Sequence, residues 1–196
     1  MSIPKTLTPD QCVSLLEELR ISQGTKKKQV QGIRNYAMAM VMLETGLRVG
    51  ELCGLIVADL WFSDEPVNFL VVREKIAKNH KERHIPISLR LRETIELMRA
   101  SLWTTEILLS NMFAFPTRDA YTPLSTRTVE RIILEAGLSA FNLVVTPHML
   151  RHTFGSRMMR KTNARIVQAL LGHESLQSTQ IYMHPNSEDL RKAIDS

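Results

Sequence analysis

The sequence predicts a mainly helical protein with one small antiparallel β-sheet, an α+β class, folded as a single domain. Most of the chain places apolar residues three and four positions apart, which is the spacing of amphipathic helices. Only residues 67–88 contain β-branched runs around a polar turn. A chain of 196 residues with 44% hydrophobic content is long enough for one sizeable core.

The first part of the chain predicts three helices. Residues 9–20 form an amphipathic pattern, and a polar stretch follows whose three lysines (26–28) we expect in a solvated loop. Residues 33–45 predict a second helix, which ends at Gly46 because glycine readily adopts the left-handed C-cap conformation. A third helix begins near Leu47.

The clearest β pattern is VNFLVVREKIAKNHKERHIPIS, residues 67–88. Two β-branched runs flank a polar turn at 78–82, which predicts an antiparallel hairpin. Pro86 has no backbone N–H to donate, so the second strand is expected at a sheet edge.

Further helices are predicted after the hairpin, at 89–97, 125–136, 147–160 and 164–171, with a short one that carries Ile181 and Tyr182. Gly137 is expected to end the second of these helices. Thr146 suits the N-cap of the third, and Pro147 suits its first position, where an N–H is not needed.

The helix that starts TPHMLRHTFG has an unusual polar face. His148, Arg151, His152 and Gly155 lie three or four residues apart and therefore share one side, while the apolar residues lie on another. Free N–H groups and the helix dipole at a helix start favour an anion. This face is therefore expected to meet a negatively charged group.

Composition restricts the function classes without deciding among them. The net charge of +5 is compatible with an anionic partner such as nucleic acid, although many basic proteins bind none. The longest apolar run, residues 36–43, is too short to span a bilayer, and the N-terminus lacks an apolar signal segment. Cys12 and Cys53 are expected as reduced thiols of a cytosolic protein rather than a disulfide.

Arginine suits a phosphate diester, because its planar fork donates two parallel hydrogen bonds and stays charged. Arg151 has this position on the polar helix face, and Arg48 follows the Gly46 turn with Glu51 one helical turn on to hold its guanidinium. Taken alone, each arginine is more often a surface residue or part of a salt bridge at the rim of the core than a phosphate ligand.

The histidines do not form a recognisable metal motif. His148 and His152 are four apart without the HExxH pattern, and His173-Glu174 has Gln rather than His at position 177. We therefore expect no metal site. Taken alone, His173 fits a polar residue after a helix C-cap, and Tyr182 fits a half-buried aromatic.

In chain order the sequence contains ETGLRVGEL, KNHKERHIPI, HMLRHTF, LLGHES and TQIYMH. Together these segments resemble the catalytic domain of the tyrosine recombinase (phage integrase) family, nearest in style to its Xer-like and phage or transposon integrase members. The resemblance extends from about Leu7 to the C-terminus. Each motif alone is weak, whereas five in the same order are specific. The resemblance implies the tyrosine recombinase catalytic-domain fold.

The resemblance also implies which residues are catalytic: Arg48, Lys78, His148, Arg151, His173 and the nucleophile Tyr182, with Glu51 as the acid that supports the first arginine. The lysine is taken from the hairpin turn, where the family usually has KGNKER and this chain has KNHKER. Lys75 and Lys81 are neighbouring alternatives for that role.

The implied chemistry is cutting and rejoining of DNA strands. Tyr182 attacks a phosphate, forms a 3′-phosphotyrosyl bond and releases a 5′-hydroxyl. The two arginines and His173 stabilise the developing charge, Lys78 protonates the departing oxygen, and His148 accepts the tyrosine proton. The resemblance implies no metal ion and no cofactor.

The expected organisation is one catalytic domain over residues 1–196, without the N-terminal core-binding domain that family members usually carry. Residues 186–196 are expected as a C-terminal tail exchanged between protomers, with folding back on its own domain as the alternative. Expected partners are double-stranded DNA, other protomers in a tetrameric synapse and accessory DNA-bending proteins, with no membrane. We expect a cytoplasmic, DNA-associated protein.

Three other functions are compatible with the same residues. A type IB topoisomerase-like enzyme would nick and reseal without exchanging strands. A DNA-binding regulator would use the fold without catalysis, which the intact Tyr182 disfavours. A metal-dependent nuclease is disfavoured because the chain lacks clustered carboxylates.

Overall fold

The computed structural model describes residues 5–21, 23–103, 111–117, 119–175 and 177–182. Within this part, the elements in chain order are α1 (Pro9–Leu19), α2 (Lys26–Thr45), α3 (Val49–Cys53), the short 3-10 helix η1 (Val57–Asp59), β1 (Trp61–Phe62), β2 (Glu65–Pro66), β3 (Phe69–Val72), β4 (Arg83–Pro86), α4 (Leu89–Ser101), α5 (Thr126–Phe141), α6 (Pro147–Met159), α7 (Ala164–Leu171) and α8 (Gln177–Gln180). The predicted mainly helical α+β class is confirmed. The expected tail at 186–196 lies outside the described residues.

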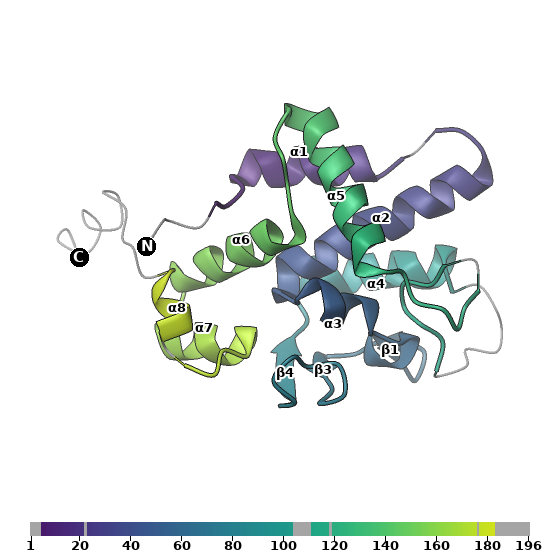
Figure 1. Cartoon of the computed structure of the whole chain (residues 1–196). Helices are drawn as coiled ribbons and strands as arrows, with labels where there is room; N and C mark the ends of the chain where they lie inside the picture. Colours follow the sequence, from purple (N-terminus) through teal and green to yellow (C-terminus); the bar gives the residue numbers. More distant parts are fainter. Residues whose placement is uncertain (1–4, 22, 104–110, 118, 176, 183–196) are drawn as a thin grey trace.

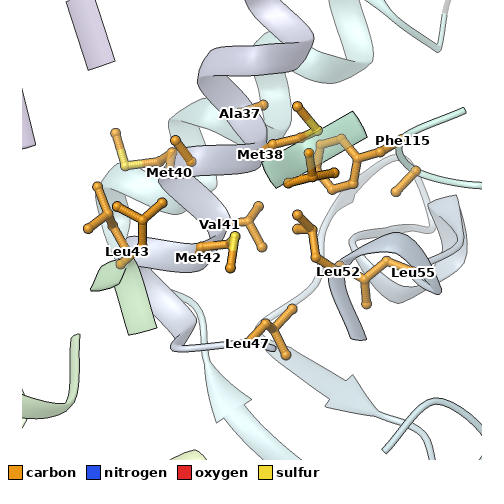
Figure 2. Packing of buried hydrophobic residues seen from close by; sticks show 14 of the residues in the cluster. Ala37, Met38, Met40, Val41, Met42, Leu43, Leu47, Leu52, Leu55 and Phe115 are labelled. Atoms are coloured by element: carbon orange, nitrogen blue, oxygen red, sulfur yellow. The ribbon is translucent and has the colours of Figure 1, made fainter. Parts of the chain in front are cut away.

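Helix α2 passes through the middle of the molecule and packs against α1, α4 and α6 (Figure 1). Residues 37–43 of this helix are all buried, whichever side of the helix they face. Figure 2 shows several of them beside Leu47, Leu52, Leu55 and Phe115. A helical segment that is apolar on every side needs cover on every side, so this part of α2 packs between the elements that carry the site.

The turns expected next to the site are present. Gly46 caps the end of α2 in the left-handed conformation, with φ of 65°, and its N–H donates to Met42. Thr146 caps α6, its hydroxyl accepting the N–H of Met149, and Pro147 occupies the first turn. Gly172 ends α7 with φ of 63°. These three caps fix where α2, α6 and α7 meet.

The prediction that the lysines at 26–28 lie in a loop is wrong, although they are exposed to solvent as expected. These lysines form the first turn of α2, which begins at Lys26 rather than at residue 33. Thr25 is the N-cap, and its hydroxyl accepts the N–H of Lys28. The cap nucleates a helix despite the polar composition, because it satisfies an N–H that the first turn leaves without a partner.

Gly137 does not end α5, which continues to Phe141 and ends at Asn142 with φ of 52°. Gly137 is needed instead for close packing, because a Cβ there would lie 2.8 Å from the carbonyl oxygen of Leu143. The sequence alone could not separate these two uses of glycine, since both place it near a helix end.

The predicted hairpin is confirmed as β3 and β4, paired antiparallel from Phe69 opposite Pro86 to Val72 opposite Arg83. Its connection, residues 73–82, is longer than the expected turn. A second, unpredicted hairpin joins β1 and β2 through Ser63 and Asp64, which both have positive φ. Within the described residues, no helix is long and apolar enough to cross a membrane.

Candidate active site

A cavity of about 930 Å³ opens between α3, α5, the start of α6 and the β3–β4 connection. Four of the residues singled out in the sequence line it: Arg48, Lys78, His148 and Arg151. They are brought there from positions as far apart as the Gly46 turn and the first turns of α6. The cavity therefore presents several cationic or proton-binding groups to one space.

Arg151 is the most deeply buried of these groups, with 2% of its surface exposed. Its guanidinium donates to the carbonyl oxygen of Gly46 and, at 2.8 Å, to that of Leu171. Both carbonyls belong to helix ends, which lack partners within their own helices. Burial and the nearby Arg48 lower the pKa of Arg151 to about 10, so it remains charged at neutral pH. Arg151 thus joins α2, α6 and α7 while it faces the cavity.

Glu51 holds two arginines at once. Its carboxylate accepts two hydrogen bonds from Arg83, at 2.9 and 2.7 Å, and one from the Arg48 guanidinium at 3.2 Å. It also accepts the backbone N–H of Arg48 at 2.8 Å, which closes the N-terminus of α3. Burial would raise the pKa of Glu51, but the bonds and charges of Arg83 and Arg48 lower it on balance. Glu51 thus contacts both the side chain and the backbone of Arg48.

Arg83 has no role in the sequence analysis, yet its side chain is almost as buried as that of Glu51. It also donates to the carbonyl oxygen of Leu170 at 3.1 Å, so it connects β4 to α7. One pattern could have indicated it. Arg83 occupies the same inward-facing register as Ile85 in β4, and an arginine at an inward strand position implies a buried acidic partner.

Lys78 lies on the cavity wall, within the β3–β4 connection, and its side chain is exposed. Lys75 and Lys81 belong to the same connection but do not line the cavity. Arg73 anchors the connection, because its guanidinium donates twice to Asp59, at 2.9 and 2.8 Å. This placement favours Lys78 over its two neighbours as the lysine that faces a ligand.

Tyr182 lies two residues after the end of α8, rather than within a helix, and only 6% of its surface is exposed. Its ring lies against Gly155 of α6, where a Cβ would come within 2.7 Å of the tyrosine Cζ. Its hydroxyl is 2.8 Å from Nδ1 of His152. Burial raises the pKa of Tyr182, and the charges of Arg151 and Arg48 oppose that rise. The hydroxyl is therefore protonated at neutral pH.

His173 stacks on the Tyr182 ring, with ring centroids 6.2 Å apart and planes 11° from parallel. Its Nδ1 lies 3.0 Å from the hydroxyl of Thr179 on α8. Burial and the charge of Arg151 lower the pKa of His173 to about 4, so the ring is neutral at physiological pH. The contact with Thr179 orients His173 and links α8 to the end of α7.

His148 and His152 touch edge to face, with ring centroids 4.1 Å apart. His148 lines the cavity and His152 reaches the tyrosine hydroxyl, so the two rings lie between the cavity and Tyr182. Burial and Arg151 lower the pKa of His148. Burial, His148 and Arg151 lower the pKa of His152 to about 4. His152 belongs to the polar helix face predicted from the sequence, but the family resemblance implies no role for it.

The sequence of the chain matches the profile of the phage integrase family over residues 5–189. The chain belongs to the phage integrase family. It is 36% identical to tyrosine recombinase XerA of Pyrococcus furiosus over 196 residues, which is 99% of this chain and 62% of that protein. It is 32% identical to tyrosine recombinase XerC of Pediococcus pentosaceus over 184 residues, covering 91% of this chain and 57% of that protein. The chain thus spans less than two thirds of the length of these curated relatives.

Solved structures of recombinases have the same fold as this chain. A crystal structure of XerA recombinase matches 98% of this chain and 63% of its own, with a TM-score of 0.77 and 29% sequence identity. The XerH site-specific recombinase bound to its difH substrate matches 99% of this chain and 54% of its own, with a TM-score of 0.74 and 20% identity. Because only 20% of positions are identical, the similarity to XerH shows a shared fold alone.

The seven site residues that the family resemblance implies lie in one region of the structure. Arg48, Lys78, His148 and Arg151 line the cavity, and Glu51 forms an ion pair with Arg48. Arg151 donates to the carbonyl oxygen of Leu171, two residues before His173, and the ring of His173 stacks on Tyr182. The described residues contain no group of three His, Cys, Asp or Glu side chains placed to hold a metal ion. Cys12 and Cys53 are both free thiols.

Proposed function

We propose that this chain is the catalytic domain of a site-specific DNA recombinase that cuts and rejoins strands through a 3′-phosphotyrosyl bond to Tyr182. The observation that carries the proposal is a tyrosine hydroxyl that reaches, through the rings of His152 and His148, a cavity lined by Arg48, Arg151 and Lys78. Relatives named as tyrosine recombinases, identical at 36% and 32% of positions, support the same activity.

The chemistry follows from the charges around the cavity. A scissile phosphate that lies between Arg48 and Arg151 would have its non-bridging oxygens stabilised by two fixed cations. Neither arginine needs to reorganise, because Glu51 holds one and two helix-end carbonyls hold the other. His173 is proposed to donate a further hydrogen bond to the phosphate. Charge that a metal ion would supply in other enzymes is here supplied by side chains.

The reaction breaks one bond and forms one. The Tyr182 oxygen attacks the phosphorus, the bond to the 5′-oxygen breaks, and Lys78 gives that oxygen a proton. The new phosphotyrosyl bond conserves the energy of the cut strand. A 5′-hydroxyl from a second duplex then reverses the steps, so neither ATP nor another cofactor is needed for rejoining.

Double-stranded DNA is the proposed partner, consistent with a net charge of +5 and with Arg127 and Arg131 of α5 on the same cavity wall. Other protomers in a tetrameric synapse, accessory DNA-bending proteins and exchange of residues 186–196 between protomers remain proposals. The same applies to a cytoplasmic, DNA-associated location.

A suicide duplex tests the proposed function, because its short cleaved strand diffuses away and leaves the protein attached. Incubation with DNA of the chain's own site should give a covalent adduct that a denaturing gel resolves. Tyr182→Phe should lose the adduct and keep its DNA affinity. An adduct that persists in this variant would contradict the assignment of the nucleophile.

Two alternatives are separated by a second readout. A topoisomerase-like enzyme would form the same adduct and relax supercoiled DNA, but would not exchange strands between two duplexes that carry the site. A regulator without catalysis would bind DNA and form no adduct at all. The proposed function therefore predicts both an adduct and exchange of strands.

A further inference from the structure

Among the described residues, the hydroxyl of Tyr182 has one hydrogen-bond partner, Nδ1 of His152, at 2.8 Å. His148, the histidine that the family resemblance makes the proton acceptor, lies one ring further away. Its ring contacts His152 edge to face and lines the cavity, which Tyr182 does not line. The direct path for the phenolic proton therefore leads to His152.

His152 is well placed to receive a proton and keep it. It is half-buried on α6, one helical turn from His148, so its position follows from the rigid helix rather than from a loop. The ring of Tyr182 also packs on Gly155 of α6, where a larger residue would collide with it. One helix therefore both carries the acceptor His152 and positions the donor Tyr182, through two residues that are three apart in sequence.

We propose that His152 takes the proton of Tyr182 as the phosphotyrosyl bond forms, holds it in the covalent intermediate and returns it when the strand is resealed. This inference rests on the proposed function, because it assumes that Tyr182 is the nucleophile. The step balances: the oxygen–hydrogen bond breaks while the oxygen–phosphorus bond forms, and the proton moves to Nδ1. Resealing reverses both changes.

The burial of His152 and the charges around it support transfer of the proton during the attack, and not before it. In the free protein, burial together with His148 and Arg151 lowers its pKa to about 4, so the ring is neutral and has a free nitrogen. Burial meanwhile raises the pKa of Tyr182, so the proton stays on the tyrosine. A phosphate bound to Arg151 would offset the charge of that arginine and make His152 more basic. The phenol becomes far more acidic as its oxygen bonds to phosphorus, so transfer accompanies attack.

The first test compares variants in single-turnover cleavage of the suicide duplex. His152→Asn places an amide near the position of Nδ1, so it can still hydrogen-bond the tyrosine but cannot take a proton. We expect its rate of adduct formation to fall by roughly a hundred- to ten-thousand-fold, the usual range for loss of a general base, with unchanged DNA affinity. The matched control is His84→Asn, an exposed histidine of β4 outside the cavity, which should cleave at the wild-type rate.

The second test changes the nucleophile instead. Incorporating 2,3-difluorotyrosine at position 182 lowers the pKa of the phenol, so less help from a base is required. It should accelerate His152→Asn much more than it accelerates the wild type. A 5′-bridging phosphorothiolate, whose thiolate leaves without protonation, should not accelerate His152→Asn selectively, because the defect lies at the nucleophile.

Each outcome decides the role of His152. A folded His152→Asn variant that cleaves at the wild-type rate, or one that fluorination fails to rescue selectively, overturns the proposal and leaves His152 only an orienting contact. Failure of the proposed function looks different: the adduct would then persist in Tyr182→Phe, or would never form in the wild type. Thermal unfolding of His152→Asn shows whether a slow rate reflects lost structure.

Discussion

Replacing Glu51 by glutamine tests whether the buried Glu51–Arg83 pair holds the site together. The side chains of Glu51 and Arg83 are 1% and 6% exposed. The carboxylate accepts two hydrogen bonds from Arg83 and two from Arg48. An amide has one accepting oxygen, so its N–H₂ group would face an N–H of Arg83. The change also removes the negative charge that balances a buried guanidinium.

Removing one member of a buried ion pair costs about 3–5 kcal/mol, because the other charge is left without compensation. The unfolding free energy of a natural domain is about 5–15 kcal/mol, so Glu51→Gln should remove a large part of it. For a chain of this size, about 2–4 °C of melting temperature is lost per kcal/mol. The expected fall is therefore about 6–20 °C.

Urea unfolding of Glu51→Gln measures this loss. The double variant Glu51→Leu/Arg83→Met is then compared with its own two single changes, Glu51→Leu and Arg83→Met. We expect the double variant to lose less unfolding free energy than the two single losses added together, because removing both charges leaves neither one uncompensated. Strictly additive losses, or a Glu51→Gln loss below about 0.5 kcal/mol, would refute this reasoning.

The pH dependence of stability should change in the same variant. The pKa of Glu51 is lower in the folded protein than in the unfolded chain, so the unfolded chain binds this proton first as the pH falls. The contribution of Glu51 is complete above the unfolded pKa of about 4.3 and is lost as the pH falls through the folded pKa. Below pH of about 4, the wild type should therefore lose stability more steeply than Glu51→Gln.

Four further substitutions test the site. Gly155→Ala should displace the Tyr182 ring and slow adduct formation without weakening DNA binding; a wild-type single-turnover rate would contradict the packing. Arg48→Ala and Arg151→Ala should each slow cleavage by roughly a hundred- to a thousand-fold, and cleavage that EDTA abolishes and magnesium restores would exclude the metal-free mechanism. Lys78→Ala should be rescued by a 5′-bridging phosphorothiolate, and rescue of the corresponding change at position 75 or 81 would move the acid there.

The features that could be predicted from the sequence depend on residues close together in the chain. Helix periodicity, the glycine cap at Gly46, the Thr146 cap with Pro147 and the β3–β4 hairpin all follow from contacts within a few residues. The order of the motifs also identified the family. The predicted start of α2, at residue 33, was nevertheless too late, because the Thr25 cap starts the helix within a polar stretch.

Only the tertiary structure decided which side chains meet. Arg83 finds Glu51 across 32 residues, Tyr182 finds His152 across 30, and Arg151 finds the carbonyl of Gly46 across 105. No local pattern specifies such partners, because they depend on how α3, α6, α7 and β4 pack around α2. The sequence shows where an arginine or a histidine lies in the chain. Its partner depends on the packing, because the packing removes both groups from water.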